Sequence, residues 1–252
     1  MSGSARQPVA QPSSNPSSEP SSNPSSEPTG ELRESRPLAG QLAVVTGASR
    51  GIGQATAALL TSAGARVAGC ARHAAPGIIA CDVGQSDDVA RFSERVLREF
   101  GTPDLIVNNA GIVARARLEE TSIEDWDAVV GGNLKGTFLI TRAFLPAMRA
   151  RKRGRIVNIA SISGRRGTAR LTAYCAAKHG VVGLTRALAE ELRDDGIAVN
   201  AVCPGSVDTE MLQVGMPGGK PDMSPEDVAN VVIYLAAYAP PALTGSCVDV
   251  FG

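Results

Sequence analysis

The sequence predicts an α/β fold: a doubly wound, mostly parallel β-sheet with helices on both faces, in a single domain. From Gly40 onward, short aliphatic and β-branched runs alternate with longer segments of helical periodicity, which is the pattern of serial β-α units. Several of the short runs are apolar throughout, so both faces of their strands must be covered. Ligands of such a sheet bind at the carboxyl ends of its strands, and we expect the functional site there.

The elements follow from this alternation in chain order. Seven segments are predicted to be strands: 42–47, 66–71, 77–83, 104–111, 155–161, 197–205 and 245–250. Five segments have helical periodicity: 53–63, 86–100, 123–150, 172–194 and 225–238.

The connection between the second and third strands is unusually short. Only residues 72–77 intervene, whereas a parallel crossover normally takes a dozen residues or more. Six extended residues span at most about 20 Å, which leaves no room for a helix. We predict a bare loop at the sheet edge and a shortened third strand.

Residues 1–37 differ from the rest in composition. Residues 13–28 are the octapeptide SSNPSSEP written twice, rich in Ser and Pro and without an aliphatic residue. Such a segment buries too little surface to offset its ordering entropy, so a disordered tail is predicted over 1–37 and the folded domain over 38–252. A tether, a phosphorylatable arm and an inert extension all remain open as its role.

Composition restricts the partners. Among 252 residues, 25 basic and 25 acidic side chains give a formal net charge of zero, so neither nucleic acid nor an anionic membrane is an expected partner. No stretch approaches 18 consecutive apolar residues and the N-terminus lacks a hydrophobic signal, so a cytoplasmic protein is expected. Five scattered cysteines without C-x-x-C and two isolated histidines predict neither a disulfide framework nor a metal site.

The segment VVTGASRGIG, residues 44–53, follows the first strand and opens the first helix. Gly47 permits a tight turn, Gly51 allows the backbone to approach a pyrophosphate, and Gly53 permits close packing of helix on strand. This pattern predicts a dinucleotide site in a Rossmann-like fold. The spacing G-x-x-x-G-x-G differs from the commoner G-x-G-x-x-G, and a tight turn without a ligand is the alternative.

The choice of dinucleotide depends on charge at the end of the second strand. An NAD site usually places an acid about 20 residues beyond the glycines, and that count from Gly51 leads to Ala71, followed by Arg72. Arg72, with Arg50 of the glycine turn, would bind a 2′-phosphate through charge-assisted hydrogen bonds. NADP(H) is therefore predicted over NAD(H). The alternative is that both arginines are solvated surface residues.

Tyr174 and Lys178 lie four positions apart within a predicted helix. Residues at i and i+4 share one face of a helix, so the ammonium can lie near the phenol oxygen. The pair predicts proton-transfer chemistry; a solvent-facing lysine over a packed tyrosine is the alternative.

From about residue 38 to its end, the chain resembles the short-chain dehydrogenase/reductase family, most of all its 3-oxoacyl-carrier-protein reductases. The resemblance rests on motifs in the family's order and approximate spacing: TGASRGIG at 46–53, CDV at 81–83, NNAG at 108–111, NLKGTF at 133–138, Ser161, Tyr174 with Lys178, and Pro204-Gly205 with Thr209.

The resemblance implies four catalytic residues. Tyr174 would donate a proton to the developing alkoxide. Lys178, and the cationic nicotinamide when the oxidised coenzyme is bound, would favour the phenolate; bringing the phenol toward pH 7 takes about three pKa units, or roughly 4 kcal/mol. Lys178 would also reach the ribose hydroxyls. Ser161 would hydrogen-bond the substrate carbonyl, and Asn133 would hold a water that links Lys178 to solvent. The alternatives are a strand-end cap for Ser161 and a helix-distorting polar core residue for Asn133.

The resemblance also implies the coenzyme contacts. Asp82 and Val83 would flank the adenine, and the backbone near Pro204 would turn toward the nicotinamide carboxamide; turn and packing roles stay open for Asn109 and Pro204. The full predicted set is Gly47, Ser49, Arg50, Gly51, Ile52, Gly53, Arg72, Asp82, Val83, Asn109, Ala110, Gly111, Tyr174, Lys178, Pro204, Gly205, Val207 and Thr209.

The chain departs from the family pattern in three places. Segment 210–227 is shorter than the usual substrate lid, and its glycines and prolines predict a poor helix and an open pocket. The ending DVFG replaces the common Asp-Gly-Gly, so altered C-terminal packing is expected. In the carrier-protein reductases, two arginines meet the acidic surface of the carrier protein. One of them matches Arg153, but the other matches Asp195. An acid at that position would repel the carrier protein, which weakens the interpretation as a carrier-protein reductase. The basic runs 149–155 and 164–167 are interpreted as solvated surface.

These inferences favour an NADP-dependent carbonyl reductase or alcohol dehydrogenase acting on a small-molecule carbonyl or alcohol. Two alternatives remain: a dedicated 3-oxoacyl-carrier-protein reductase with acyl carrier protein as partner, and a catalytically slow NADP(H)-binding or scaffold protein. By family likeness, a homodimer or homotetramer is expected, with the helices at 123–150 and 172–194 packed across a two-fold axis.

Overall fold

The computed structural model describes residues 36–252. The predicted tail lies outside the described residues except for its last two positions, as does the whole Ser/Pro repeat. None of the helices within residues 36–252 has the length and apolar character needed to cross a membrane.

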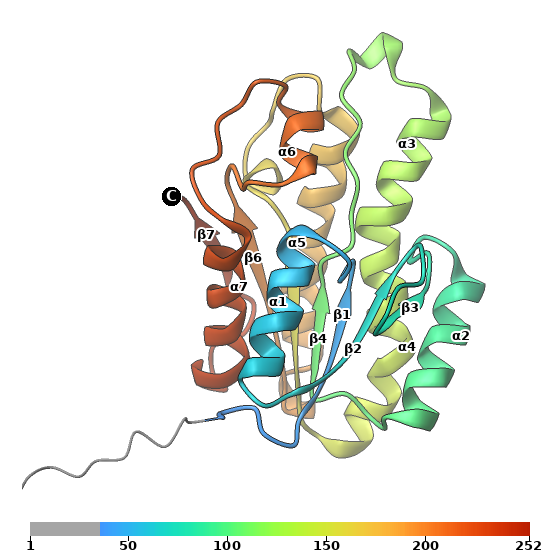
Figure 1. The fold of residues 1–252 in the computed structure, drawn as a ribbon, viewed down its shortest axis with the longest axis vertical. Helices are drawn as coiled ribbons and strands as arrows, with labels where there is room; N and C mark the ends of the chain where they lie inside the picture. Colours follow the sequence, from blue (N-terminus) through green and yellow to red (C-terminus); the bar gives the residue numbers. More distant parts are fainter. Residues whose placement is uncertain (1–35) are drawn as a thin grey trace, which may run out of the picture. The chain divides into compact units, whose positions relative to one another are not determined.

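Seven parallel strands form one sheet in the order β3-β2-β1-β4-β5-β6-β7 (Figure 1). The strands are β1 Leu42–Thr46, β2 Arg66–Ala71, β3 Ile78–Ala80, β4 Leu105–Asn108, β5 Gly154–Ile159, β6 Ile197–Pro204 and β7 Cys247–Val250. Every pairing is parallel, which confirms the predicted doubly wound, Rossmann-like sheet. The order of connection reverses between β1 and β4, which is the switch point where ligands of such sheets bind.

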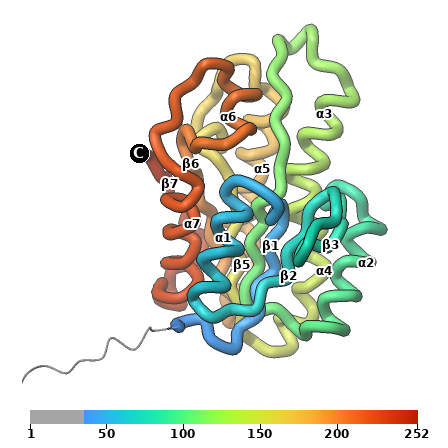
Figure 2. The backbone as a smooth tube through the Cα atoms, viewed as in Figure 1, coloured from blue at the N-terminus to red at the C-terminus, as the bar shows by residue number. Residues whose placement is uncertain are grey.

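Helices cover both faces of the sheet (Figures 1 and 2). They are α1 Gly51–Ser62, α2 Ser86–Glu99, α3 Ile123–Val130, α4 Gly136–Arg151, α5 Thr172–Glu191, α6 Glu210–Gly215 and α7 Pro225–Ile233. On one face, Val45 packs in a buried cluster with Leu60 of α1 and Val232 of α7. On the other face, the neighbouring Val44 packs with Phe92 of α2, among other residues. Successive side chains of a strand point to opposite faces, which explains the continuous apolar runs.

The predicted helix over 123–150 contains an irregular turn. A five-residue π-helix, Gly131–Lys135, separates α3 from α4 and carries Asn133. The helical periodicity predicts a regular helix over 123–150, and no proline lies within residues 131–135 to signal the change. π-turns often occur at functional sites, and this one places Asn133 at the site described below.

The short connection between β2 and β3 is confirmed. Strand β3 has three residues, and no helix lies between β2 and β3. The loop that joins them is closed by a bridge between Ala75 and Ile78. In contrast, the prediction of a poor helix over 210–227 is wrong for residues 210–215, which form α6. The hydroxyl oxygen of Thr209 accepts a hydrogen bond from the Leu212 amide at 3.4 Å, and such an N-cap stabilises a short helix.

Candidate functional site

Two cavities meet at the carboxyl ends of the strands. The larger, of about 1220 Å³, lies beside the glycine turn, and the smaller, of about 590 Å³, lies beside Tyr174. Four residues line both cavities: Ile52, Asn109, Thr209 and Met211. The two spaces therefore form adjoining parts of one site.

The glycine turn forms the floor of the larger cavity. Gly47 and Gly51 have positive φ values of 65° and 54°, and a Cβ atom at Gly53 would overlap the carbonyl oxygen of Gly47. The side-chain amide of Asn109 braces the turn by donating to the carbonyl oxygens of Thr46 at 2.9 Å and Gly47 at 3.2 Å. The N-terminus of α1 follows, with free amides that suit a pyrophosphate. These features fit a dinucleotide.

The arginines at the larger cavity differ in their partners. Arg72 is exposed, lines the cavity and forms no ion pair within residues 36–252. Arg50 is instead paired with Glu210 at the start of α6, and both side chains are largely exposed. Asp82 has a local structural contact, because its carboxylate accepts a hydrogen bond from the Gly84 amide at 2.9 Å.

Tyr174 and Lys178 lie together on α5, and both line the smaller cavity with Ser161. The side chain of Lys178 is buried, with only 3% of the residue exposed, which contradicts the solvent-facing alternative. Its ammonium donates to the carbonyl oxygen of Ile159 at 2.8 Å and lies 5.6 Å from the centre of the Tyr174 ring. The Tyr174 hydroxyl lies 3.9 Å from the sulfur of Met211, a weak acceptor.

Ser161 follows β5, where the chain turns toward α5. Its hydroxyl oxygen accepts a hydrogen bond from the Ser163 amide at 3.0 Å and caps the turn Ile162–Gly164. Ser161 is therefore a cap at the end of β5, as the alternative predicts. Its hydroxyl hydrogen is not used in this contact and can point into the cavity that Ser161 lines.

Burial shifts the pKa values of both α5 groups. It raises the pKa of Tyr174 to about 12, although the nearby Ser161 hydroxyl acts in the opposite direction. It lowers the pKa of Lys178 to about 8. Without coenzyme, desolvation of the phenolate therefore dominates the pKa of Tyr174. That Lys178 and a bound oxidised nicotinamide favour the phenolate stays a prediction.

Asn133 lies behind the cavity lining. Its amide nitrogen donates to the carbonyl oxygens of Ile112 at 2.7 Å and Val129 at 2.8 Å, while its buried Oδ1 has no hydrogen-bond partner within residues 36–252. A Cβ atom at Gly111 would overlap this oxygen and would lie 3.7 Å from the Lys178 ammonium. Leaving such an acceptor unpaired costs about 1–3 kcal/mol, so this oxygen is suited to a water or ligand near Lys178.

The remaining predicted positions divide between the two cavities. Except for Gly53, which packs under the turn, every predicted coenzyme residue lines at least one of them. The larger cavity is lined by Gly47, Ser49, Arg50, Gly51, Ile52, Arg72, Asp82, Val83, Asn109, Ala110, Gly111 and Thr209. The smaller cavity is lined by Tyr174, Lys178, Pro204, Gly205 and Val207 as well as the shared residues.

Sequence reasoning missed the apolar walls of the smaller cavity. Phe251 lines it from the C-terminal segment, which is held to the end of β6 by a hydrogen bond from the Gly205 amide to the Val250 carbonyl at 2.9 Å. Other missed lining residues are Val113, Leu171, Leu212 and Met216. Isolated apolar residues have no motif that distinguishes a pocket wall from a core position.

The parallel sheet, its glycine turn at the switch point and the buried Tyr174–Lys178 pair define a dinucleotide-binding oxidoreductase. The short chain dehydrogenase family model matches residues 41–216, and the chain belongs to that family. Its members use a nicotinamide cofactor, which agrees with the turn geometry.

The similar proteins agree with this assignment. The chain is 38% identical to a 3-oxoacyl-acyl-carrier-protein reductase of Pseudomonas aeruginosa over 241 residues, which cover 85% of this chain and 97% of that protein. It is 37% identical to an acetoacetyl-CoA reductase of Rhizobium meliloti over 235 residues, or 84% and 97% of the two chains. A solved structure described as ribose-5-phosphate isomerase from Brucella melitensis 16M is 36% identical, with a TM-score of 0.81 over 86% of this chain and 92% of that one.

Proposed function

We propose that the protein reduces a ketone to a secondary alcohol with NADPH, using Tyr174 as the proton donor. The observation that carries the proposal is the burial of Tyr174 and Lys178 beside Ser161, where the two cavities adjoin. Two relatives named as reductases of 3-oxoacyl and acetoacetyl thioesters support a ketone substrate.

The reaction forms a C–H bond at the carbonyl carbon and an O–H bond at the carbonyl oxygen. A bound reduced nicotinamide supplies the hydride. Tyr174 supplies the proton, and its pKa of about 12 keeps it protonated at neutral pH, which is the form that reduction needs. The Ser161 hydroxyl donates a hydrogen bond to the carbonyl oxygen and stabilises the charge that develops there.

Lys178 and Asn133 restore the proton on Tyr174 after each turnover. The amine of Lys178 and the unpaired Oδ1 of Asn133 both lie near Gly111, where a water can bridge them. Lys178 would also orient the coenzyme through the ribose hydroxyls. Because its pKa is lowered to about 8, Lys178 exchanges protons readily near neutral pH.

The coenzyme preference rests on Arg72. Its guanidinium lines the larger cavity without an acidic partner in the described chain, and the preceding Ala71 offers no carboxylate to a ribose hydroxyl. A 2′-phosphate would therefore be attracted and an unphosphorylated ribose would gain no specific contact. NADP(H) is the proposed coenzyme, with Arg50 as a second contact if it leaves Glu210.

The substrate is proposed to be a small ketone, with a dedicated carrier-protein reductase as second candidate because of the named relatives. Arg153 and Asp195 lie at the amino ends of the strands, away from the cavities of this chain. Arg153 is paired with Asp104 at 2.8 Å, and Asp195 with Arg149 at 2.7 Å. Both charges are thus used within the chain, which favours the small ketone.

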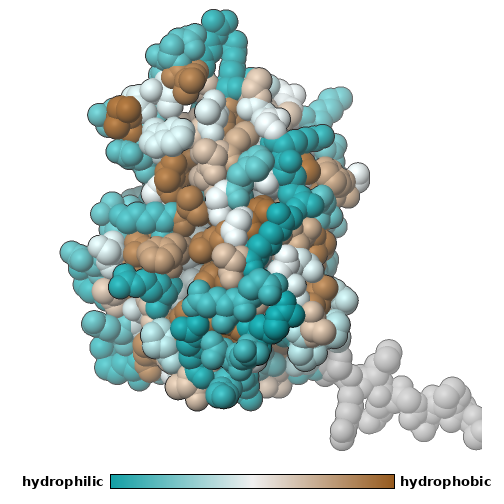
Figure 3. Space-filling view, turned by 180° about the vertical axis from the view of Figure 1, so that it is seen from behind, coloured by the Kyte–Doolittle hydropathy of each residue, from teal (hydrophilic) through white to brown (hydrophobic). Residues whose placement is uncertain are grey.

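A homodimer or homotetramer is proposed by family likeness, with α4 and α5 at the interface. Phe138 of α4 is 45% exposed, and an interface over α4 would bury this ring. The view from behind in Figure 3 shows apolar side chains in patches between hydrophilic ones. Light scattering of the purified protein measures the assembly.

The proposed function is tested by loss of NADPH absorbance over a panel of ketones and β-ketoesters, with Tyr174→Phe as the control. Turnover by the wild type and its loss in Tyr174→Phe are expected. NADPH binding without turnover of any carbonyl would contradict the proposal and favour a scaffold role.

A further inference from the structure

Two adjacent arginines follow Ser161 and have different surroundings. Nε of Arg165 forms an ion pair with Asp249 of β7 at 3.2 Å, and both side chains are about one-third exposed. Arg166 lines the smaller cavity and forms no ion pair within residues 36–252. The first arginine therefore anchors the loop to the sheet, and the second presents a free cation to the cavity.

The cavity around Arg166 is otherwise mostly apolar. Its walls include Val113, Leu171, Met211, Leu212, Met216 and Phe251. The other charged residues that line it are Lys178, which is buried against the Ile159 carbonyl, and Asp222. Arg166 is the one arginine that the described chain contributes to this lining.

The loop that carries Arg166 is held in place by the catalytic segment. The Arg166 amide donates to the Ile162 carbonyl at 3.0 Å, and the Gly164 amide donates to the Ser161 carbonyl at 2.8 Å. The Ser163 and Thr168 hydroxyls are hydrogen-bonded at 3.1 Å. The backbone of Arg166 is thus held at a fixed position relative to Ser161, from which the side chain reaches the cavity.

We propose that Arg166 is a specificity-determining residue that binds an anionic group of the substrate, a carboxylate or phosphate joined to the reacting ketone by an apolar chain. This inference rests on the proposed function and names its substrate class. A guanidinium forms paired, charge-assisted hydrogen bonds with either anion, and the apolar walls suit the chain between anion and ketone. A neutral ketone would use the walls alone.

The test compares matched anionic and neutral substrates. One arm uses keto acids with one to four methylenes between ketone and carboxylate, each against its methyl ester. The other arm uses keto-alkyl phosphates of the same chain lengths, each against its keto alcohol, so that the carboxylate and the phosphate are distinguished. The measured quantity is the ratio of kcat/KM for the anionic and neutral member of each pair.

Four proteins are compared: wild type, Arg166→Gln, Arg166→Lys and Arg98→Gln. Arg98 on α2 is a matched control, because its side chain is 68% exposed and it lines neither cavity. In at least one arm, the wild type is expected to prefer the anion by about tenfold, which is the size of a charge-assisted contact. Arg166→Gln should abolish that preference through KM, Arg166→Lys should retain part of it, and Arg98→Gln should keep it.

A wild type without preference for the anion in either arm would overturn the inference, as would an unchanged ratio in Arg166→Gln. The neutral substrates report separately on the proposed function. If no carbonyl is reduced at all, the proposed function fails, and calorimetry of keto-acid binding to wild type and Arg166→Gln decides the inference. About tenfold weaker binding to the variant supports it, and equal binding overturns it.

Discussion

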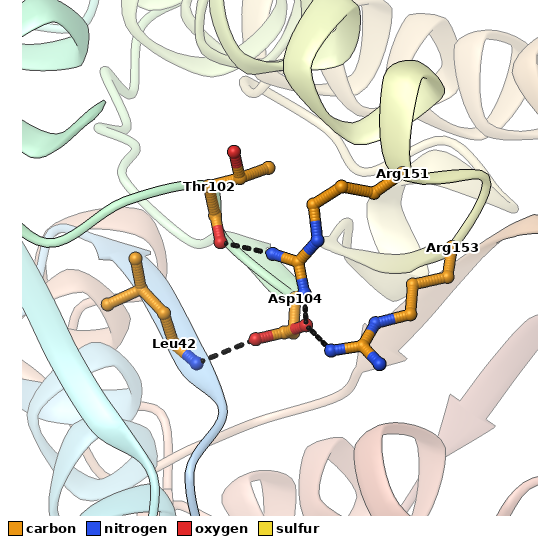
Figure 4. A network of polar contacts seen from close by, with 5 residues as sticks. All are labelled: Leu42, Thr102, Asp104, Arg151 and Arg153. Carbon is orange, nitrogen blue, oxygen red and sulfur yellow. Dashed lines mark hydrogen bonds and ion pairs between the residues drawn. The ribbon is translucent and has the colours of Figure 1, made fainter.

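The two ends of the sheet differ in how their polar groups are partnered. At the amino ends, the Asp104 carboxylate accepts hydrogen bonds from the Leu42 amide at 3.0 Å and from Arg151 and Arg153 at 2.8 Å each (Figure 4). Arg151 also donates to the Thr102 carbonyl at 2.7 Å. This network joins β1, β4 and the start of β5.

At the carboxyl ends, several polar groups lack such partners within residues 36–252. Oδ1 of Asn133 is buried and unpaired, the Tyr174 hydroxyl meets a thioether sulfur, and Arg72 and Arg166 form no ion pairs. Buried polar groups are normally satisfied, so the unpaired Oδ1 of Asn133 beside the cavities indicates a place for a water or ligand. One end of the sheet therefore serves stability, and the other serves binding and chemistry.

The largest expected effect is that of Tyr174→Phe. The substitution removes the proposed proton donor and leaves the ring, so kcat for the proposed ketone reduction should fall by about 10²- to 10⁴-fold. The melting temperature should change little, because the lost hydrogen bond to sulfur is weak. Steady-state kinetics and thermal unfolding measure the two effects, and a variant with nearly full activity would contradict the assignment of Tyr174.

Lys178→Met should separate stability from activity. Because burial lowers the pKa of Lys178 to about 8, a wild-type protein at pH 6–7 must bury a charged amine that the unfolded chain exposes at little cost. The variant should abolish turnover and increase the free energy of unfolding by about 2 kcal/mol at pH 6–7.

The sign of the Lys178 effect follows from linkage. The pKa of Lys178 is lower in the folded chain than its value of about 10.4 in the unfolded chain. The neutral amine therefore favours the folded state above about pH 10.4, and this contribution to stability is lost as the pH falls through about 8. The difference in the free energy of unfolding between Lys178→Met and the wild type should therefore shrink between pH 8 and 10. Denaturant unfolding at a series of pH values measures it, and an advantage independent of pH would exclude this explanation.

Arg72→Asp should reverse the charge at the proposed binding site of the coenzyme ribose. The ratio of kcat/KM with NADPH to that with NADH should fall by about 10- to 100-fold, because a carboxylate repels the 2′-phosphate and accepts from a ribose hydroxyl. Arg98→Gln is again the surface control. An unchanged ratio would remove the main support for NADP(H).

The smallest expected effect is at the amino ends. Asp104→Asn should lower the free energy of unfolding by about 1–2 kcal/mol and leave kcat unchanged, since the network lies away from both cavities. Although burial alone would raise the pKa of Asp104, the Leu42 amide and the two arginines lower it below its usual value. The difference between wild type and variant should thus be largest above about pH 4 and diminish as the pH falls further.

Urea unfolding at neutral and acidic pH measures the Asp104 effect. Asp194→Asn is the control, because Asp194 is exposed and forms no ion pair among the described residues. A loss of activity in Asp104→Asn would show that the two ends of the sheet are coupled.

Much of the fold was predictable because its signals are local. Alternating apolar runs located all seven strands, and the short interval between Ala71 and Ile78 excluded a helix before β3. The π-turn around Asn133 was not predictable, since it depends on tertiary hydrogen bonds to Ile112 rather than on local sequence. Thr209 is a suitable N-cap residue in the sequence, but the glycines and prolines that follow it predict a poor helix.

The site was predictable where motifs carry it and not where packing does. The spacing of Tyr174 and Lys178 predicts their proximity, but the pKa of Tyr174 follows from burial, which only the folded chain defines. Likewise, the wall formed by Phe251 depends on the path of the C-terminal segment. The roles of the catalytic residues and the NADP(H) preference remain predictions.

The most direct test is the ionisation of Tyr174 with and without oxidised coenzyme. Tyrosinate absorbance of the wild type, minus that of Tyr174→Phe, isolates this phenol among the three tyrosines of the chain. We expect a pKa of about 12 for the protein alone and a lower value with NADP⁺, whose cationic ring would stabilise the phenolate. A value that NADP⁺ leaves unchanged would contradict the placement of Tyr174 beside the nicotinamide.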